Sequence, residues 1–541
     1  MPLTPVSGAS ANSMNYKESI PVIDLFAGPG GLGEGFSSIG GSEKGTQKFR
    51  LRVSIEKDAV AHATLSLRAL FRAFPKGEVP EAYYQYVRGE ITRDELFAHP
   101  SIPTEAIEAS REAKQVELGK VAPEQVDQWV RDALNGAQDW VLIGGPPCQA
   151  YSVAGRARRT KESQEAFESD EKHFLYKEYL RIIQRFMPTI FVMENVKGML
   201  SSKHSGLHIF QQILSDLSAP AEGLAYHIRS FVVPEDGDKL NPHDFVIQAE
   251  RYGLPQARHR VILFGVRADV ASTCPALLER PQNLVLERSQ APFTVDQALS
   301  GLPPLRSEIS RGKDSLEAWL AALQEAHILM LRHYVAGSGN LLEIMRKAAT
   351  DAGKLHSSGG KFIPWSAVTK MTPKQREWYL DHRLKGVLQH KARSHMLSDL
   401  HRYIYAASYA KLHGASPKIQ QFPKQFLPAH ENVTSESVPF SDRFRVQLAG
   451  APSTTIVSHI SKDGHYYIHP DPSQCRSLTV REAARLQTFP DNYFFEGNTT
   501  QQYTQIGNAV PPLLARKIAA IVATVIDSYR AGKVHQSAQN L

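Results

Sequence analysis

Residues 21–33 read PVIDLFAGPGGLG, a short apolar run that passes directly into a glycine-rich turn. The run has the length and composition of a buried β-strand, and Gly28, Gly30 and Gly33 follow it with G-x-G-x-x-G spacing. In a doubly wound sheet such a turn lets the backbone approach a nucleoside, and a carboxylate ending the next strand binds the ribose hydroxyls. Glu56 ends the next apolar run, 23 residues past Gly33, and fits that role.

Further apolar runs continue this pattern along the chain. Stretches of helical length and period separate several of them, so the strands alternate with helices. Short, nearly all-apolar strands in such an order predict a mostly parallel sheet covered on both faces, and we expect an α/β fold with a doubly wound sheet. The runs lie at 51–56, 140–143, 190–194, 226–233 and 260–266, and the helical stretches include 59–71, 175–185 and 209–217.

This alternation is interrupted twice. Residues 75–138 are rich in Glu, Ala, Gln and Lys and predict a helical insertion, and the alternation is absent from 273 to 475. That second stretch predicts a smaller α+β or irregular domain. The expected organisation is a flexible tail at 1–17, a catalytic and cofactor-binding domain at 18–272, the second domain at 273–475, a return to the first domain at 476–530, and a flexible tail at 531–541.

The composition of the 541 residues is that of a soluble globular protein, with 42% hydrophobic and 22% charged residues. No apolar run approaches the roughly 20 residues of a membrane span, and residues 1–16 lack a secretory signal, so we expect a cytoplasmic protein. Three widely spaced cysteines favour neither a disulfide framework nor a zinc cluster. The net charge of +7 is compatible with a nucleic-acid partner without requiring one.

Residues 144–152 (GGPPCQAYS) place Cys148 just after a strand, behind two prolines. A lone cysteine is more often an inert buried thiol. Here the rigid loop and the nearby Arg156, Arg158 and Arg159, which would favour a thiolate, make Cys148 a candidate nucleophile.

Two further motifs end or begin strands of the predicted sheet. Residues 191–198 (FVMENVKG) put Glu194 at a strand end, where it would face the same crevice as Cys148 and serve as an acid. Residues 256–260 (QARHR) put Arg258 and Arg260 on one face of an extended segment, suited to carbonyl or phosphate oxygens. The simpler alternatives are a solvated carboxylate and a surface cation pair.

Two motifs follow the stretch 273–475, the variable region between the QARHR motif and the rest of the first domain. Residues 476–490 (RSLTVREAARLQTFP) predict a helix that Pro490 ends, and residues 505–512 (QIGNAVPP) predict a turn into the final helix. Taken in this order, the motifs resemble those of the DNA (cytosine-5)-methyltransferases of the prokaryotic type, over roughly 18–267 and 476–530. The resemblance implies the fold of S-adenosylmethionine-dependent methyltransferases, with a target-recognition domain at 273–475.

The family's acidic loop against the cofactor's adenine is not evident in the sequence. Residues 89–92 and the stretch just before Trp140 are the candidate places. For the rest of the cofactor site, the resemblance implies S-adenosylmethionine, leaving as S-adenosylhomocysteine, and no metal. Phe26 would stack on the adenine, Glu56 would hold the ribose and Asn508 would approach the methionine end. The other expected cofactor contacts are Gly28, Gly30, Gly31 and Pro146.

By the same resemblance, Cys148 adds to C6 of a cytosine flipped out of duplex DNA, and Glu194 acts at N3. Arg260 binds O2, with Arg258 in support. The implied protein is a monomer in a prokaryotic cytoplasm, associated with the nucleoid, and a restriction endonuclease is an optional functional partner. Three alternatives stay open: methylation of tRNA, a catalytically silent DNA-binding regulator, and a nicotinamide-dependent oxidoreductase. A variable region of about 200 residues favours DNA, where one site must be discriminated among many.

The basic surplus is confined to that variable region. Residues 273–475 hold 24 basic and 17 acidic residues, a surplus of 7 that accounts for the whole net charge. Residues 354–424 alone hold 13 basic and 3 acidic residues. We therefore expect this segment to contact DNA, through cations such as Lys374, Arg376, Lys385 and Arg393.

Overall fold

The computed structural model describes residues 19–41, 46–147, 175–201, 203–204, 207–235, 240–332, 339–366, 368–428 and 442–539. Its main element is an eight-stranded sheet in the order β3-β2-β1-β4-β5-β11-β8, with β9 also paired to β11. The first five strands are parallel, and β11 runs antiparallel to its neighbours. This confirms the predicted α/β fold. The strands are β1 (Ile20–Leu25), β2 (Phe49–Glu56), β3 (Ala113–Gln115), β4 (Val141–Gly144), β5 (Ile190–Val196), β8 (Tyr226–Arg229), β9 (Val246–Gln248) and β11 (His259–Arg267).

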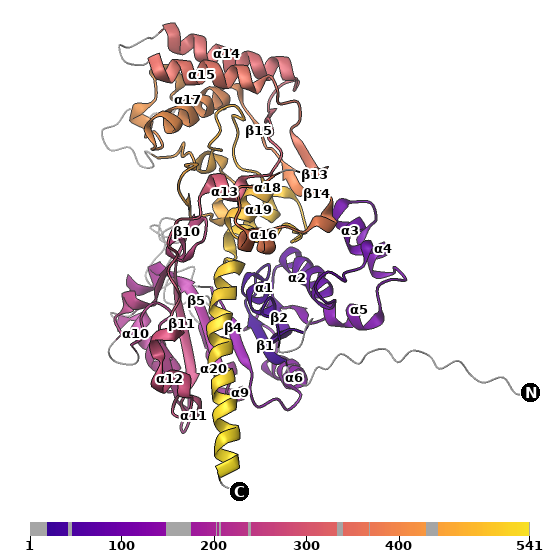
Figure 1. The fold of residues 1–541 in the computed structure, drawn as a ribbon, viewed down its shortest axis with the longest axis vertical. Coiled ribbons are helices and arrows are strands. Elements are labelled where there is room, and N and C mark those ends of the chain that lie inside the picture. The colour runs from indigo at the N-terminus through magenta and orange to yellow at the C-terminus, as the bar shows by residue number, and fades with distance from the viewer. Residues whose placement is uncertain are drawn as a thin grey trace, which may run out of the picture.

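Helices cover both faces of this sheet (Figure 1). Adjacent strand residues point to opposite faces, so Val22 lies in one core and Ile23 in the other. The first core packs against α1 (Gly31–Ser37) and α20 (Pro512–Gln539). The second packs against α6 (Pro123–Leu134), α9 (Leu175–Phe186) and α10 (Ile209–Ser218).

The helical stretch Thr499–Lys533 is long and apolar enough, by length and composition, to cross a membrane. However, 72% of its most apolar window is buried inside the protein. Within the described residues its apolar side chains, such as Ile518 and Val522, belong to the core beneath the sheet.

The predicted insertion at 75–138 is shorter than expected. Its helices are α3 (Glu81–Arg88), α4 (Arg93–Phe97) and α5 (Thr104–Ser110), which follow α2 (Ala59–Arg72). β3 and α6 then return to the sheet, so the inserted part ends near residue 112. The sequence concealed this because β3 is a three-residue edge strand, Ala-Lys-Gln, with no apolar run.

The second domain also begins later than residue 273. Cys274, Leu277 and Leu286 are buried in the same core as α20, so they belong to the first domain. Beyond them a helical bundle forms the far end of the molecule, with an antiparallel pair of strands nearer the first domain (Figure 1). The bundle consists of α14 (Leu316–Arg332), α15 (Gly339–Ala352) and α17 (Leu397–His413), and the strand pair of β13 (Gly359–Pro364) and β14 (Gly386–Lys391).

A third group of short helices joins the bundle to the sheet. These helices share one hydrophobic core, which includes Trp378, Leu486 and Tyr503. The chain then enters α20, which continues to Gln539, so most of the expected tail at 531–541 is helical. The joining helices are α13 (Val295–Leu299), α16 (Pro373–Tyr379), α18 (Val480–Leu486) and α19 (Thr499–Asn508).

Candidate functional site

The glycine-rich turn lies between β1 and α1, at the carboxyl end of the parallel strands. Gly28 and Gly30 have φ angles of 58° and 90°, which an L side chain rarely adopts. A Cβ on Gly30 would also lie 2.8 Å from Leu65, whereas none of the described atoms lies within 4 Å of a Cβ on Gly28. Gly31 packs against the IGNAVPP segment, where its Cβ would meet the Val510 carbonyl at 2.1 Å. The turn is therefore tight on one side and open beside Gly28.

Glu56 connects this turn to the end of the neighbouring strand β2. Its Oε2 accepts a hydrogen bond from the Gly28 amide at 2.9 Å, and its Oε1 accepts one from the Asp58 amide at 2.8 Å. The predicted strand-end carboxylate thus lies directly beside the turn. Phe26, half-buried with a φ of 58°, follows β1 on the same side and packs against the hydrophobic core.

A further acidic side chain lies at the carboxyl end of the sheet, at a position that the sequence analysis did not single out. Glu117 follows β3, the strand next to β2, and its carboxylate lies 3.4 Å from the Lys57 ammonium. The two positions expected for the acidic loop against the adenine do not lie at the carboxyl end of the sheet. Residues 89–92 join α3 to α4, and Trp140 precedes β4 at the amino end of that strand. Only knowledge of the edge strand β3 would have pointed to Glu117.

The loop after β4 is fixed by the neighbouring strand β5. The Asn195 amide nitrogen donates to the Pro146 carbonyl at 3.2 Å, and Asn195 is only 4% exposed. A Cβ on Gly145 would lie 3.0 Å from Glu194 Oε2, so this backbone passes close to the carboxylate. Cys148, the predicted nucleophile, lies outside the described residues.

Glu194 and Arg260 form the polar pair of the site. Arg260 Nε lies 2.8 Å from Glu194 Oε1, and both side chains are about 13–14% exposed. They come from adjacent antiparallel strands, β5 and β11. The structure therefore brings together the predicted acid and the predicted cation.

Arg258 points in a different direction from Arg260. Its guanidinium donates to the Ile456 carbonyl at 2.8 Å and to the Gly507 carbonyl at 3.2 Å. Burial, with Arg260 nearby, lowers the pKa of Arg258 below its usual value. Asn508, next to Gly507, is exposed at the end of α19. Arg258, just before β11, thus connects this strand to Ile456 and to the IGNAVPP motif.

The other two cysteines are buried. The Cys274 thiol donates to the Val525 carbonyl and the Cys475 thiol to the Leu400 carbonyl. Burial raises the pKa of Cys475 well above its usual value. Both are poor nucleophiles, which leaves Cys148 as the candidate.

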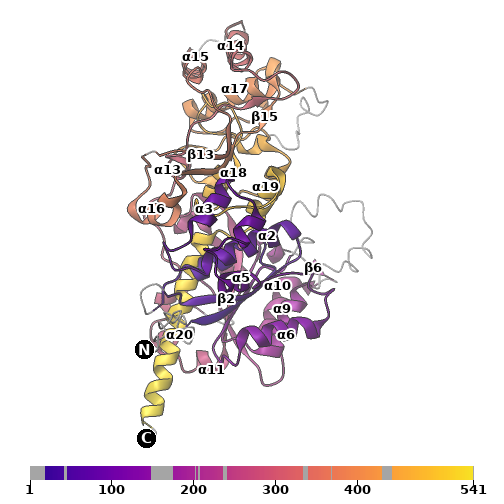
Figure 2. The same ribbon diagram turned by 90° about the vertical axis from the view of Figure 1, so that its right-hand side faces the viewer.

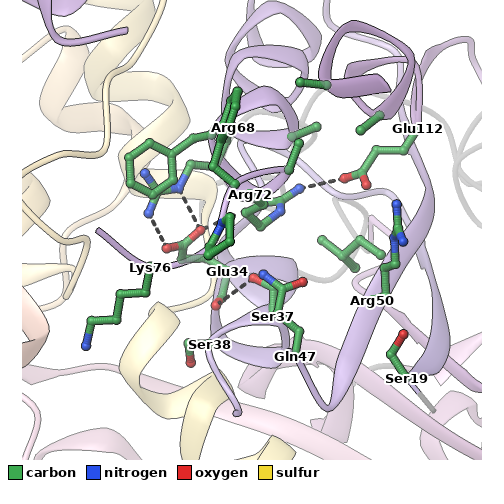
Figure 3. A pocket seen from close by; sticks show the side chains of 18 of the residues that line it. Ser19, Glu34, Ser37, Ser38, Gln47, Arg50, Arg68, Arg72, Lys76 and Glu112 are labelled. Carbon is green, nitrogen blue, oxygen red and sulfur yellow. Dashed lines mark hydrogen bonds and ion pairs between the residues drawn. The ribbon is translucent and has the colours of Figure 1, made fainter. Parts of the chain in front are cut away.

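A large groove of about 1980 Å³ lies elsewhere, along α1, α2, α5 and the start of β2. Figure 3 shows its wall, where Glu34 is ion-paired with Arg68 at 2.5 Å and Glu112 with Arg72 at 2.6 Å. Its lining, among the described residues, includes none of Gly28, Glu56, Glu194 and Arg260. We therefore do not assign the chemistry to this groove.

The sheet, its glycine-rich turn and its strand-end carboxylates define an enzyme with the S-adenosylmethionine-dependent methyltransferase fold. The family model of the C-5 cytosine-specific DNA methylases matches residues 121–523, most of the chain. The chain therefore belongs to the C-5 cytosine-specific DNA methylase family.

Named relatives agree with this assignment. The chain is 31% identical over 523 residues to the type II methyltransferase M.Bpa9945I of Bacillus paralicheniformis, with 94% of this chain and 99% of that protein covered. It is 28% identical over 546 residues to M.AgeI of Thalassovita gelatinovora, with 93% and 99% covered. A solved structure of a prophage-encoded E. coli protein, described as a DNA modification methyltransferase, has a TM-score of 0.50 at 19% identity, covering 94% of this chain and 100% of that one. The similarity to this solved structure shows only that the two proteins share a fold.

Proposed function

We propose that this protein methylates C5 of a flipped-out cytosine within a specific sequence of duplex DNA, through a covalent bond between Cys148 and C6. The observation that carries this proposal is the Glu194–Arg260 pair beside the loop that leads to Cys148. Type II methyltransferases among the relatives support a DNA substrate. A cognate restriction endonuclease and a cytoplasmic location belong to the same proposal.

Cytosine C5 is a weak nucleophile, so the ring must first be activated. The Cys148 thiolate attacks C6, and the electron pair of the C5–C6 bond moves into the ring toward N3. Glu194 in its acid form donates a proton or hydrogen bond to N3, and the Arg260 guanidinium binds O2. C5 then carries the electron density that accepts the methyl group. Loss of the C5 proton to a base, expulsion of the thiolate from C6 and return of the N3 proton to Glu194 then restore the aromatic ring. General acid help of this kind is typically worth about 10²–10⁴-fold in rate.

The residues at the glycine-rich turn fit S-adenosylmethionine. Gly28 borders open space, and the Glu56 carboxylate, beside it, suits the ribose hydroxyls. Phe26 would stack on the adenine, Glu117 would accept from its amino group, and Asn508 would approach the methionine end. Gly30 and Gly31 would shape the turn, and Pro146 would close the far side. The cofactor supplies an electrophilic methyl group, and the protein's own groups supply the activation of C5.

The covalent step is tested with duplex DNA that carries 5-fluorocytosine at the methylated site. We expect a denaturant-resistant complex that forms with the wild-type protein and is absent with Cys148→Ser. A wild-type protein that methylates normal DNA without forming this complex would contradict the covalent route.

The nucleic-acid substrate is tested separately, with labelled S-adenosylmethionine offered alongside duplex DNA or tRNA. We expect transfer to duplex DNA, and bisulfite mapping of the product to show one methylated context. Preferential transfer to tRNA would overturn the DNA proposal, and transfer to neither would support the silent regulator.

A further inference from the structure

A tyrosine from the carboxyl-terminal part of the chain contacts the glycine-rich turn. The Tyr493 hydroxyl, 464 positions further along the chain, donates a hydrogen bond to the Pro29 carbonyl. A Cβ on Gly30 would lie 3.0 Å from the same hydroxyl, so the hydroxyl lies against the backbone at this glycine. Tyr493 is 0% exposed. In such a buried place a hydrogen bond that is lost is not replaced by one to water.

Strand β2 holds the preceding part of the turn. The Ala27 amide donates to a carbonyl of β2 at 3.0 Å, and the Gly28 amide donates to Glu56 Oε2 at 2.9 Å. Both amides come before Pro29, whose carbonyl Tyr493 binds. Two distant parts of the chain therefore fix the turn, β2 at its first residues and Tyr493 at the residues that follow.

The ring of Tyr493 has support of its own. The Arg68 guanidinium lies 4.8 Å from the ring centroid and is ion-paired with Glu34 of α1 (Figure 3). Arg68 also donates to the side chain of Asn492 at 3.1 Å. The Phe489 ring packs against the same tyrosine, with 4.6 Å between the ring centroids. The tyrosine side chain thus has one defined position, as a positioning group requires.

The backbone that carries Tyr493 is anchored outside the turn. Two residues earlier, the Asp491 amide donates to the Tyr379 carbonyl at 2.8 Å. The Asp491 carboxylate is ion-paired with Arg485 at 2.8 Å. Tyr379 ends α16 and Arg485 lies on α18, so both partners belong to the joining helices. These contacts place Tyr493 without involving the glycine-rich turn.

We propose that Tyr493 is a positioning residue for the cofactor, because its hydroxyl holds the Pro29–Gly30 backbone in the conformation that S-adenosylmethionine binds. This inference rests on the proposed function, which puts the cofactor beside Gly28. Gly28 directly precedes Pro29, so a shift of the Pro29 carbonyl moves the backbone that borders the cofactor. A turn that is ordered before the ligand arrives lowers the entropic cost of binding.

The experiment compares Tyr493→Phe with Tyr226→Phe as its matched control. Tyr226 is 3% exposed and its hydroxyl also donates to a proline carbonyl, that of Pro188 at 2.7 Å. It lies on β8, at the opposite end of the strand order from β3. Each substitution removes one buried hydroxyl and keeps the ring.

Four quantities are measured for the wild type and both variants. Titration calorimetry gives the Kd of S-adenosylmethionine and S-adenosylhomocysteine without DNA, and steady-state kinetics gives KM and kcat for both substrates. Hydrogen exchange of the peptide that covers residues 27–33 reports the order of the turn in the cofactor-free protein. The melting temperature reports the stability that each variant loses.

We expect Tyr493→Phe to raise the Kd of both cofactor forms about tenfold, which corresponds to about 1.4 kcal/mol. The turn should exchange faster, while kcat at saturating cofactor and KM for DNA stay near the wild-type values. Tyr226→Phe should lose similar stability and keep the wild-type Kd and exchange of the turn.

A wild-type cofactor Kd in Tyr493→Phe, or an equal rise in both variants, would overturn the inference. A wild-type protein that binds neither cofactor form would contradict the proposed function. The exchange rate of the turn would then still show, independently of the cofactor, whether Tyr493 orders it.

Discussion

At the scale of single residues, the two arginines of QARHR have separate partners. Arg260 binds Glu194, while Arg258 holds two backbone carbonyls that lie about 200 and 250 positions away in the sequence. Arg258 lies between β10 (Gln256–Ala257) and β11 and only Arg260 belongs to β11, so the two arginines are not on one continuous strand and do not share a face. We infer that Arg260 acts on substrate and that Arg258 acts as a positioning residue.

Glu194→Gln keeps the size of the side chain and removes its acid. Because the expected role is to protonate or hydrogen-bond N3, we expect kcat to fall by about 10²–10⁴-fold while DNA binding changes little. Glu250→Gln is a matched control, since Glu250 pairs with His259 at 2.8 Å, one residue from Arg260. Single-turnover methylation of the mapped site measures both variants, and a Glu194→Gln enzyme with wild-type kcat would exclude the acid role.

His390 provides a stability prediction at this scale. Its two ring nitrogens bond the Thr479 hydroxyl and the Pro303 carbonyl, and burial lowers its pKa from 6.5 to about 4. Between these values the unfolded chain binds a proton that the folded chain does not. The contribution of the neutral His390 to the free energy of unfolding is therefore fully present above pH 6.5. It is lost as the pH falls toward 4.

We expect the melting temperature to drop between pH 7.5 and pH 5, and His390→Gln to make this drop smaller. The exposed His227→Gln serves as the control and should leave the drop unchanged. Calorimetry at both pH values measures the difference. A drop of equal size in His390→Gln and wild type would show that other groups cause it.

At the scale of elements, the insertion α3–α5 joins helix α2 to the strand β14 and the residues just before it. Leu384 and Leu388 of the second domain share a hydrophobic core with Leu70 and Val87. Hydrogen bonds reinforce this core: the Tyr84 hydroxyl donates to Asp381 at 2.8 Å and the Tyr86 hydroxyl to Glu496 at 2.6 Å. The insertion therefore packs against both parts and restricts their relative movement.

Removing the Tyr84 and Tyr86 hydroxyls tests whether the insertion restricts the movement of the two parts. Hydrogen bonds to charged groups are worth about 1.5–3 kcal/mol each, so the Tyr84→Phe, Tyr86→Phe double variant should loosen the contact without unfolding either part. We expect faster hydrogen exchange in α3 and β14 and a raised KM for DNA, with cofactor binding unchanged. Lys76→Ala is the control, since the exposed Lys76–Glu377 pair contributes little. An unchanged hydrogen-exchange rate in β14 would show that these hydrogen bonds do not hold the insertion against the second domain.

At the scale of the whole molecule, the basic segment 354–424 does not form one surface. Figure 2 shows α16, which carries Lys374 and Arg376, on the opposite side of the molecule from α19, which ends at Asn508. Arg393 is not a free surface cation either, since it bonds the Ile460 carbonyl and lies 4.0 Å from the Tyr503 ring. The expectation that this segment contacts DNA stays a prediction, and a single DNA surface can engage only part of its cations.

We expect Lys374→Gln, Arg376→Gln to leave the salt slope of DNA binding unchanged, because solvent screens exposed charges that face away from the DNA over a Debye length of about 10 Å. The slope of log Kd against log salt on the mapped site is the measurement. Lys462→Gln provides the contrast, since Lys462 is exposed directly after the 3₁₀-helix Ser458–Ser461, which packs against α19. A reduced slope in the α16 variant would place that helix on the DNA.

The sequence by itself determined the sheet, the glycine-rich turn and the strand-end groups Glu56, Glu194 and Arg260. These features depend on local patterns. Apolar runs define buried strands, and the residues that border each run lie at the ends of the strands. Tertiary structure alone decided the partners of Arg258, the place of Glu117 just after β3, the ends of the insertion and the division of the basic segment. Those features arise where distant segments pack together, and no local pattern encodes which side chain will meet the Ile456 carbonyl or which face of the molecule α16 will occupy.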